Sequence, residues 1–354
     1  MDLNELRGKI DGLDDQLLDL LSKRMEVVKA VGELKKHEKS IIYRPEREKA
    51  IIDRLTELSQ GMLSRSAIEA IFLEIFAVSR NIELPEKVAY LGPEGSFTHQ
   101  AAESRFGAMS EYISLRTIKS VFDNVETGRV RFGVVPIENN QEGSVAETID
   151  MLCERDVKIV AEIPMAINFT FASMEDNPKK IKKIYSKDIA FRQCREFIQD
   201  YFGDDIKLVE VASTSKAAKL ALENENSAAI CSHIAAKLYG LPILFDNIED
   251  SKHNTTRFLI LAQDVLNQKS ENDKTSILAK LSDRPGALVD FLKEFSFRDL
   301  NLTKIESRPA RIKDSFKYWF LIDFDGHYQD EKVQQILEKY GDSLVFLGSY
   351  VKLC

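Results

Sequence analysis

The sequence has few cysteines, few histidines and no long apolar run, and each scarcity excludes a class of protein. Its four cysteines, scattered over 354 residues, lack metal-ligand spacing and are typical of reduced thiols in a cytoplasmic protein. Five dispersed histidines give no support to a zinc site or a catalytic triad. No segment has the run of about 20 apolar residues that crosses a bilayer, and no secretory signal is present. A net charge of −8 disfavours nonspecific nucleic-acid binding.

What is present is ordinary for a globular chain of two or three domains, with 44% hydrophobic and 30% charged residues. The first helix expected has an apolar seam with steps of three and four residues, at Leu3, Leu6, Ile10, Leu13, Leu17 and Leu20. Arg24 takes the next position of this seam. Lys35 follows eleven residues later, about three turns on, and shares its face. Two cations on an apolar face need an anionic partner, which is either an internal carboxylate or a ligand.

The same helix predicts a second chain. Arg7 lies seventeen residues before Arg24, about 100° away around the helix, so it faces elsewhere unless another copy brings it to a shared pocket. From Leu3 to Lys35 the helix spans about 48 Å, more than so small a domain covers alone. The pattern therefore indicates a dimer built by helix exchange or long helix packing.

Two further helices are expected, over Pro45–Leu58 and Ser64–Glu83. With Leu6-Arg7, Arg24, Gly32–Lys35 and Arg44–Glu48, this segment resembles the all-helical class of chorismate mutase, an intertwined dimer of three-helix chains. The resemblance implies that Arg7 crosses into the partner's site and that Lys35 donates to the ether oxygen of chorismate. It assigns Arg24, Arg47 and Ser79 to the substrate carboxylates, and Glu48 to the ring hydroxyl.

Two positions depart from that family's pattern. Glu83 stands where a glutamine is well known, and a glutamate can donate a hydrogen bond to the ether oxygen only when it is protonated. The mutase rate is therefore expected to fall as pH rises. Arg44 replaces an acidic residue of some relatives, and we interpret it as a solvated arginine before proline.

After a polar hinge at Asn81–Lys87, strands and helices alternate, which predicts α/β layers with largely parallel sheets. Strands are expected at Val88–Leu91, Tyr112–Leu115, Phe132–Ile137, Val157–Phe171, Ile181–Tyr185, Ile206–Val211, Ala228–Cys231, Ile243–Phe245 and Arg257–Leu261. Helices are expected at His99–Phe106, Lys119–Thr127, Phe191–Phe202 and Lys216–Glu223. A ligand would bind where strands end and helices begin.

Polar residues gather at three of these strand ends. Gly92–Thr98 joins a strand to a helix through a glycine-bearing turn, and such helix starts bind anions. Ser96 within it either binds substrate or only starts the helix. Glu138 and Asn139 follow a second strand, and Ser213–Ser215 caps a helix after a third. Together they favour a polyanionic small molecule held without a metal.

With Thr256–Phe258, the segments Gly92–Thr98 and Val135–Asn139 resemble prephenate dehydratase. That family has two α/β lobes, similar to type II periplasmic binding proteins, around a cleft. The resemblance implies Thr256 as the essential hydroxyl and Arg257 as a partner of a substrate carboxylate. It places five more residues in the cleft: Asn139, Ser186, Gln193, Ser213 and Thr214. The chain departs from better-known members at Lys187–Ala190, where those are richer in His, Pro and Gln.

A polar linker, Gln263–Lys274, precedes a βαββαβ pattern that predicts an α+β ferredoxin-like unit. Its elements are expected at Ser276–Leu281, Gly286–Phe297, Leu302–Ser307, Tyr318–Phe324, Glu331–Tyr340 and Leu344–Tyr350. Pro285–Leu288 and Glu306–Pro309 resemble the signatures of ACT domains, which regulate phenylalanine-controlled enzymes. The resemblance implies that L-phenylalanine binds between two such units, near Gly286, Ala287, Leu288, Glu306 and Ser307.

The order of the three segments, 1–84, 87–265 and 274–354, resembles the bifunctional chorismate mutase/prephenate dehydratase family with a C-terminal ACT domain. The resemblance implies conversion of chorismate to prephenate and then to phenylpyruvate, with feedback inhibition by L-phenylalanine. Neither reaction requires a cofactor or metal, and no nucleic acid or membrane partner is expected. We expect a cytoplasmic homodimer or dimer of dimers. Two alternatives stay open here: a dehydratase with a decayed mutase domain, and a non-catalytic amino-acid-sensing binding protein.

Overall fold

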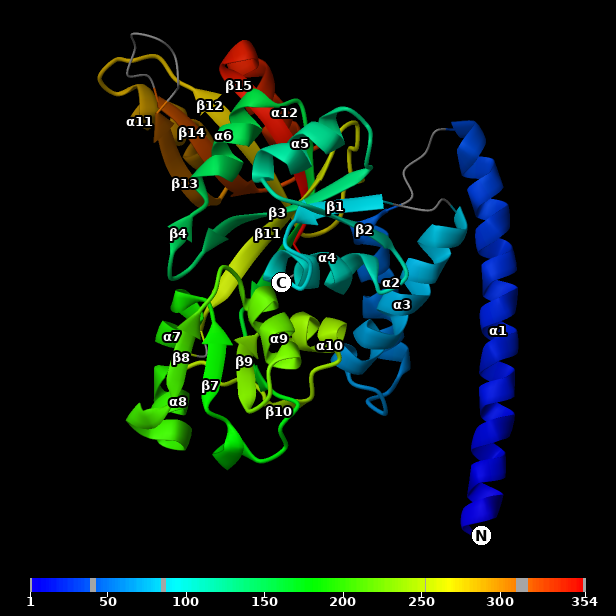
Figure 1. Ribbon diagram of the computed structural model, residues 1–354. Coiled ribbons are helices and arrows are strands. Elements are labelled where there is room, and N and C mark those ends of the chain that lie inside the picture. The colour runs from blue at the N-terminus through cyan, green and yellow to red at the C-terminus, as the bar shows by residue number, and fades with distance from the viewer. Residues whose placement is uncertain (1, 39–42, 84–86, 252, 310–317, 353–354) are drawn as a thin grey trace. The chain divides into compact units, whose positions relative to one another are not determined.

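The computed structural model describes residues 2–38, 43–83, 87–251, 253–309 and 318–352. The chain divides into two compact units, Met1–Glu86 with Phe106–Glu111, and Lys87–Arg105 with Tyr112–Cys354. The first unit holds three helices, α1 (Leu3–Glu38), α2 (Pro45–Leu58) and α3 (Arg65–Glu83), close to the predicted bounds (Figure 1). Within the described residues, no helix is long and apolar enough to cross a membrane.

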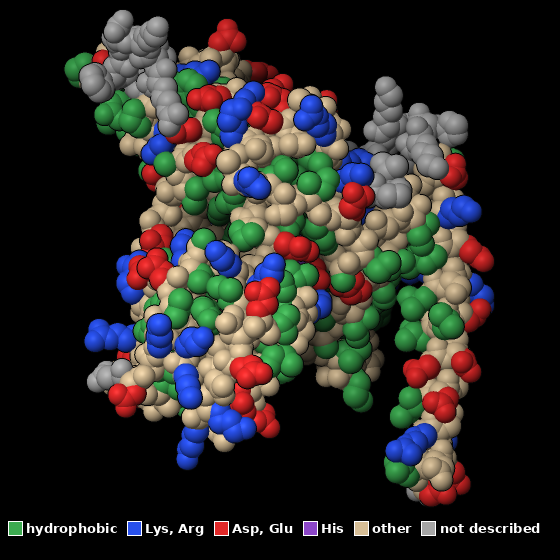
Figure 2. Space-filling model, in the orientation of Figure 1, with side chains coloured by type: hydrophobic (Ala, Val, Ile, Leu, Met, Phe, Trp, Pro, Cys, Tyr) green, Lys and Arg blue, Asp and Glu red, His purple; other side chains and the backbone are tan. Residues whose placement is uncertain are grey.

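Helix α1 is covered along only part of its length. The seam from Leu3 to Leu20 is 45% to 63% exposed, and apolar side chains are visible along this helix in Figure 2. Further along, Gly32 lets α1 approach α3, because a Cβ there would lie 3.2 Å from the Cα of Glu83. Helices α2 and α3 pack around a small core of Ile52, Ile68 and Phe76. The exposed seam is therefore a large apolar surface that this chain leaves uncovered.

The second unit contains two mixed α/β sheets. The first has the order β2-β1-β3-β11-β5, with β4 paired to β3. Its strands are β1 (Lys87–Leu91), β2 (Glu111–Leu115), β3 (Phe132–Asn139), β4 (Gly143–Ser144), β5 (Lys158–Ala166) and β11 (Thr255–Ala262). The second has the order β10-β6-β9-β7-β8. Its strands are β6 (Thr170–Ala172), β7 (Lys183–Ser186), β8 (Lys207–Glu210), β9 (Ser227–Cys231) and β10 (Ile243–Phe245).

The helices of these two layers are α4 (Phe97–Phe106), α5 (Ile118–Glu126), α6 (Ala146–Glu154), α7 (Asp188–Gln193), α8 (Arg195–Phe202), α9 (Thr214–Glu223) and α10 (His233–Tyr239). The chain passes from the first sheet to the second after β5 and returns before β11. Two predicted elements are each divided, since Val157–Phe171 forms β5 and β6, and Phe191–Phe202 falls in α7 and α8. Helices α6 and α10 were not expected.

The expectation of largely parallel sheets is wrong. Strand β11 runs antiparallel to both β3 and β5, and β6 runs antiparallel to β9 and β10. The reason is that the chain crosses between the two sheets twice. The first strand after each crossing, β6 and then β11, runs opposite to both of its neighbours. The α/β class itself is confirmed.

The predicted C-terminal βαββαβ unit is confirmed as a four-stranded antiparallel sheet of order β13-β14-β12-β15. Its elements are β12 (Asp273–Lys280), α11 (Ala287–Phe297), β13 (Leu302–Pro309), β14 (Tyr318–Asp325), α12 (Glu331–Tyr340) and β15 (Leu344–Val351). Asp273 and Lys274, which were expected in a linker, are buried in β12.

The C-terminal sheet shares a hydrophobic core with the first α/β sheet. Leu259 and Leu261 of β11 belong to the same buried cluster as Leu278, Leu321, Leu347 and Tyr350. The strands approach closely at Gly348 of β15, where a Cβ would lie 2.1 Å from the carbonyl oxygen of Ile159. Any larger residue at position 348 would push the two sheets apart.

Candidate active sites and regulatory pocket

The helical unit encloses a cavity of about 590 Å³ with a cationic lining. The charged lining residues are Arg24, Arg44, Arg47, Arg80, Glu48 and Glu83, a net charge of +2. The other lining residues are Val27, Val28, Val31, Ile51, Phe76 and Ser79. The structure therefore brings together five predicted mutase residues, Arg24, Arg47, Glu48, Ser79 and Glu83. Such a lining suits a small dianion with an apolar ring.

Ser79 joins two helices at this cavity. Its Oγ accepts a hydrogen bond from Nη1 of Arg24 and donates one to the carbonyl oxygen of Ile75, at 2.6 Å. Burial lowers the pKa of Arg24, although the nearby Glu83 acts to raise it. Ser79 thus orients Arg24, and its own proton would have to turn away from Ile75 to reach a substrate carboxylate.

Arg80 is a pocket residue that the sequence interpretation missed. It is 4% exposed, forms an ion pair with Glu48, and lies 5.4 Å from the ring centre of Tyr43 and 5.8 Å from that of Phe106. The signal was present, because Arg80 follows Phe72 and Phe76 at intervals of four, in a position where an apolar stripe would continue. This is the argument that singled out Arg24.

Three other predictions for the helical unit have different outcomes. Arg44 lines the cavity and is half-buried, so its interpretation as a solvated arginine is wrong. Arg7 is exposed on α1 and does not line the cavity, about 25 Å along the helix from Arg24. Lys35 belongs to α1, but its side chain lies outside the described residues.

A polar network surrounds Thr256 where β11 begins. Nδ2 of Asn139 donates to Oγ1 of Thr256 at 2.8 Å and to Oδ1 of Asn254 at 2.7 Å. Nδ2 of Asn254 donates to Oε1 of Gln193 at 3.2 Å, and Nε2 of Gln193 donates to Oε1 of Gln141 at 2.8 Å. Thr256 and Asn254 are 9% and 5% exposed. The network therefore joins three predicted residues, Asn139, Gln193 and Thr256, to Asn254 and Gln141.

Asn254 and Gln141 were not predicted as site residues. Gln141 follows β3, Gln193 ends α7, and Asn254 lies where the chain returns to the first sheet. The sequence alone could not show that these side chains meet, because Gln193 lies 52 positions from Gln141 and 61 positions from Asn254. Because Thr256 accepts the hydrogen bond from Asn139, its own hydroxyl proton is not used in that bond.

The remaining predicted cleft residues have mainly local bonds. Oγ of Ser96 accepts from His99 N at 3.3 Å, an N-terminal cap of α4. Oγ of Ser213 accepts from Lys216 N at 3.0 Å, which caps α9, and Thr214 begins that helix. Ser186 is fully buried and donates to the carbonyl oxygen of Ile230 at 2.6 Å. Among the described residues, these bonds do not link the four side chains to the Thr256 network.

The turn Gly92–Thr98 uses its polar backbone groups within the protein. Gly95 N donates to Nδ1 of His99 at 3.2 Å, and burial lowers the pKa of that imidazole, which keeps Nδ1 an acceptor. The carbonyl oxygens of Glu94 and Gly95 accept from Ser215 and Ser232. Gly95, with φ of +78°, has Ser215 and Ala235 too close for a Cβ. These bonds support a packing role for the turn.

Arg257 is surrounded by protein carboxylates. Nε lies 3.2 Å from Glu138, and Nη1 lies 3.2 Å from Glu162 and 2.8 Å from Asp323. Burial alone would lower the pKa of this guanidinium, but Asp323, with Tyr350 and Glu162, raises it. A substrate carboxylate would have to compete with three carboxylates that are already in place.

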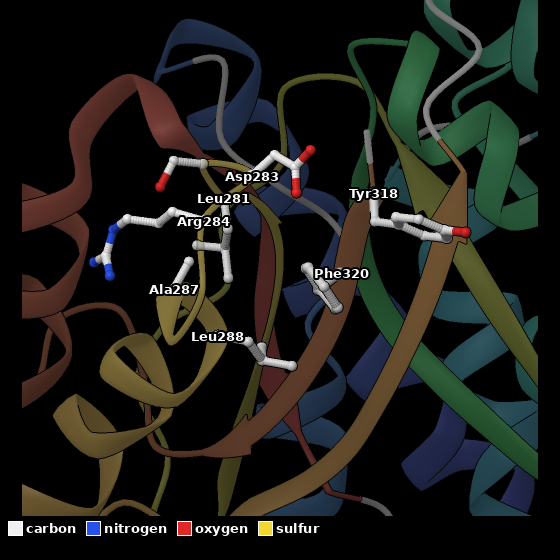
Figure 3. Close-up of a pocket in the computed structure, with 8 residues that line it drawn as sticks. Leu281, Asp283, Arg284, Ala287, Leu288, Tyr318 and Phe320 are labelled. Carbon is white, nitrogen blue, oxygen red and sulfur yellow. The ribbon is translucent and has the colours of Figure 1, made fainter. Parts of the chain in front are cut away.

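The C-terminal unit has its own cavity, of about 150 Å³. The lining residues are Leu281, Ser282, Asp283, Arg284, Ala287, Leu288, Tyr318 and Phe320. In Figure 3, Leu281, Ala287 and Leu288 face Phe320, while Arg284 extends away from it. Arg284 pairs with Asp290 at 2.9 Å. The cavity thus combines an apolar wall with a polar loop, a combination suited to an amino acid with an apolar side chain.

Two of the five residues predicted for L-phenylalanine, Ala287 and Leu288, line this cavity. Gly286 precedes α11 in the left-handed region, with φ of +82°, where a residue with a side chain would be strained. Glu306 and Ser307 lie on the edge strand β13 and are not part of the lining.

The fold and these sites define a multidomain chain with a cationic helical cavity, a two-sheet α/β region with a polar network, and a C-terminal four-stranded ACT-like sheet. A family model for chorismate mutase type II matches residues 6–84, and one for prephenate dehydratase matches residues 88–265. The chain is 41% identical to a bifunctional chorismate mutase/prephenate dehydratase of Aquifex aeolicus over 358 residues, which cover 99% of this chain and 98% of the relative. One from Stutzerimonas stutzeri is 38% identical over 359 residues, with the same coverage of both chains.

The chain belongs to the bifunctional chorismate mutase/prephenate dehydratase family of phenylalanine biosynthesis. It has chorismate mutase and prephenate dehydratase activities. A solved structure of prephenate dehydratase from Arthrobacter aurescens, in complex with L-Phe, is 31% identical with a TM-score of 0.67. The match covers 75% of this chain and 90% of that one.

Proposed function

We propose that chorismate binds in the cationic helical cavity, with its two carboxylates toward Arg24 and Arg47. The observation that supports this is the net charge of +2 around a cavity of 590 Å³, because it offsets the two negative charges of the chorismate carboxylates. The rearrangement needs no nucleophile. Its rate depends on holding the substrate in a reactive shape and on stabilising charge at the ether oxygen.

Within that site, Ser79 orients Arg24, and Arg80 holds the carboxylate of Glu48 toward the ring hydroxyl. Glu83 and Lys35 donate to the ether oxygen. Glu83 can do so only as a carboxylic acid. The contacts of Ser79 and Arg80 support the first two roles, and the family pattern supports the others.

We also propose that the mutase site is completed by a second copy of the chain. Two features support a dimer: the uncovered seam of α1, and the distance of Arg7 from the cavity of its own chain. Burying such a seam against an identical helix would bring the partner's Arg7 to the cavity. The mass of the assembly in sedimentation experiments distinguishes a dimer from a dimer of dimers.

For the dehydratase reaction, we propose that Thr256 donates its proton to the hydroxyl of prephenate as that group leaves. The bond from Asn139 fixes Oγ1 and leaves the proton to point at substrate. Carbon dioxide leaves from the ring carboxylate, hydroxide leaves as water after taking the proton of Thr256, and a proton from solvent then restores the threonine hydroxyl. A hydroxyl is a weak acid, so preorganised donors must supply most of the effect. We do not assign Arg257 to the substrate, because of its three protein carboxylates.

We propose that L-phenylalanine binds at the cavity of the C-terminal unit and inhibits the dehydratase. Ala287 and Leu288 would contact the ligand, with Glu306 and Ser307 contributed by the partner of a C-terminal pair. The L-Phe complex of the Arthrobacter aurescens structure supports this ligand. The proposed domains are 1–84, 87–265 and 274–354. A cytoplasmic location is supported by Cys153, Cys194 and Cys231, which are unbridged thiols.

One experiment tests these proposals together. Chorismate consumption and phenylpyruvate formation are measured separately on one preparation, with and without L-phenylalanine. We expect both activities, and inhibition of phenylpyruvate formation from added prephenate. A dehydratase rate that L-phenylalanine does not change would contradict the regulatory proposal. Phenylpyruvate formation from prephenate without any consumption of chorismate would contradict the assignment of the helical cavity.

A further inference from the structure

Six charged side chains form one connected network between the first α/β sheet and the C-terminal sheet. Glu138, Glu162 and Arg257 come from the dehydratase strands β3, β5 and β11. Lys274, Lys304 and Asp323 come from β12, β13 and β14. We call these six residues the charged network.

Its contacts are direct. Arg257 contacts all three carboxylates, at 3.2 Å from Glu138, 3.2 Å from Glu162 and 2.8 Å from Asp323. Lys274 lies 2.6 Å from Glu162, and Lys304 pairs with Glu138. Five of the six side chains are no more than 15% exposed. At such burial an unbalanced charge is costly.

The charges balance only when both sheets are present. The dehydratase strands supply two carboxylates and one guanidinium, a net charge of −1. The C-terminal strands supply two ammonium groups and one carboxylate, a net charge of +1. Each half therefore neutralises the other, and neither half is balanced on its own.

The network adjoins the catalytic threonine through the strand register. Thr256 pairs with Asn139, and Arg257 pairs with Glu138, on the antiparallel strands β11 and β3. Since side chains alternate along a strand, Thr256 and Asn139 occupy one face while Arg257 and Glu138 occupy the other. The pairing shifts directly after Arg257, which interrupts the regular ladder at this point. Arg257 and Thr256 are therefore consecutive residues beside an irregularity in the ladder, so a side chain that anchors Arg257 also restrains the backbone at Thr256.

Asp323 is the member of the network best fixed in place. Its side chain is 4% exposed, and Oγ of Ser276 donates to its Oδ1 at 2.7 Å. Ser276 is in turn bonded to the hydroxyl of Tyr350 at 2.8 Å. The other oxygen of Asp323, Oδ2, is left to accept from Arg257.

We infer that Asp323 is a positioning residue for the dehydratase reaction. From the C-terminal sheet it holds Arg257, and through Arg257 it keeps Thr256 in the orientation that dehydration needs. The inference rests on the proposed role of Thr256. A purely structural role would instead make Asp323 a stabiliser of the junction between the sheets, with no effect on the turnover of folded enzyme.

The test is Asp323→Asn in the full-length protein, which removes the charge and keeps the shape. At a temperature well below unfolding, we expect the dehydratase kcat to fall about tenfold to a hundredfold, since small misplacements of a reacting group cost this much. KM for prephenate and the mutase kcat/KM should stay close to wild type. The matched control is Asp325→Asn on the same strand, where the carboxylate pairs with Lys352 at 2.6 Å and is 35% exposed. It should leave dehydratase kcat unchanged.

Two more variants separate positioning from folding. Asp323→Glu keeps the charge and should recover part of the lost kcat. Ser276→Ala removes one hydrogen bond to Asp323 and should lower the dehydratase kcat by less than Asp323→Asn does. If Asp323→Asn does not fold, a wild-type kcat in Ser276→Ala overturns the inference. A folded Asp323→Asn enzyme with wild-type kcat overturns the inference, and so do equal losses in both Asp→Asn variants. Full activity of Thr256→Val would instead overturn the proposed function, whatever Asp323→Asn does.

Discussion

The helical cavity and the charged network both gather arginines, yet they differ in charge balance. The cavity has four arginines and two glutamates around an open space of 590 Å³, a surplus of +2. The network has three cations and three carboxylates in contact with one another, so each charge is offset within the protein. A surplus of charge around a space indicates a site for an anion, whereas a balanced set indicates structure or positioning. An arginine beside a catalytic residue is therefore not, by itself, a substrate ligand.

The largest effect is expected at Thr256, which lies beside the balanced network. Thr256→Val is nearly isosteric and removes the proton donor, so dehydratase kcat should fall by roughly a thousandfold or more. Mutase activity should be spared. Thr255→Val is the matched control on the neighbouring residue, whose side chain points to the opposite face. A near-wild-type dehydratase rate in Thr256→Val would refute the assignment.

At the cavity with surplus charge, Arg24→Met should lower the mutase kcat/KM by about a hundredfold to a thousandfold, since one preorganised donor is lost. The dehydratase kcat should not change. Arg65→Met serves as the control, because Arg65 is an exposed arginine of the same helical unit paired with Asp53 and Glu69. Equal losses in the two variants would mean that the effect is not specific to the cavity.

The mutase site is also proposed to need a second copy of the chain. Leu13→Asp puts a charge on the uncovered seam of α1, where Leu13 is 62% exposed, and should convert dimers to monomers in sedimentation experiments. Mutase kcat/KM should fall at least about tenfold, because the partner's Arg7 is lost as a preorganised donor. Ser22→Asp adds the same charge on the opposite face of α1 and should keep both the dimer and the activity. Monomeric Leu13→Asp with full mutase activity would show that Arg7 is not needed from a partner.

The smallest effect concerns Glu83. If its carboxylic acid donates to the ether oxygen, the active form is the protonated one, so mutase kcat/KM falls as pH rises. Glu83→Gln donates at every pH and should flatten the profile between acid and neutral pH, with only a modest change in rate at low pH. A wild-type profile that is already flat over this range would sink the idea.

Much of the secondary structure could be predicted from periodicity, and helix α2 has the predicted bounds. The break between β5 and β6 could not be predicted, because Ile167 and Phe169 continue the apolar run across it and are themselves buried. It is the passage between two sheets, a tertiary feature, that divides the run. The antiparallel direction of β11 has the same origin.

The site could be predicted in part. Arg24 of α1 was found because the apolar seam predicts an apolar residue at its position, whereas Arg47 of α2 was found only from the family pattern. Arg257 was found from its motif, but its partners Glu162 and Asp323 lie 95 and 66 positions away in the sequence. No local pattern shows that they converge on it. The family pattern assigned Arg257 to the substrate, whereas only the tertiary structure shows how its charge is compensated.

The core shared by β11 and the C-terminal sheet has a consequence for synthesis of the protein. Leu347 and Tyr350 of β15 pack in the same cluster as Leu259 and Leu261, and Gly348 lies against Ile159. A ribosome must therefore release β15 before the dehydratase core can close, although Thr256 was made about ninety residues earlier. During translation the dehydratase face of this core would stay uncovered until β15 has been made, so dehydratase activity would not appear before that strand folds.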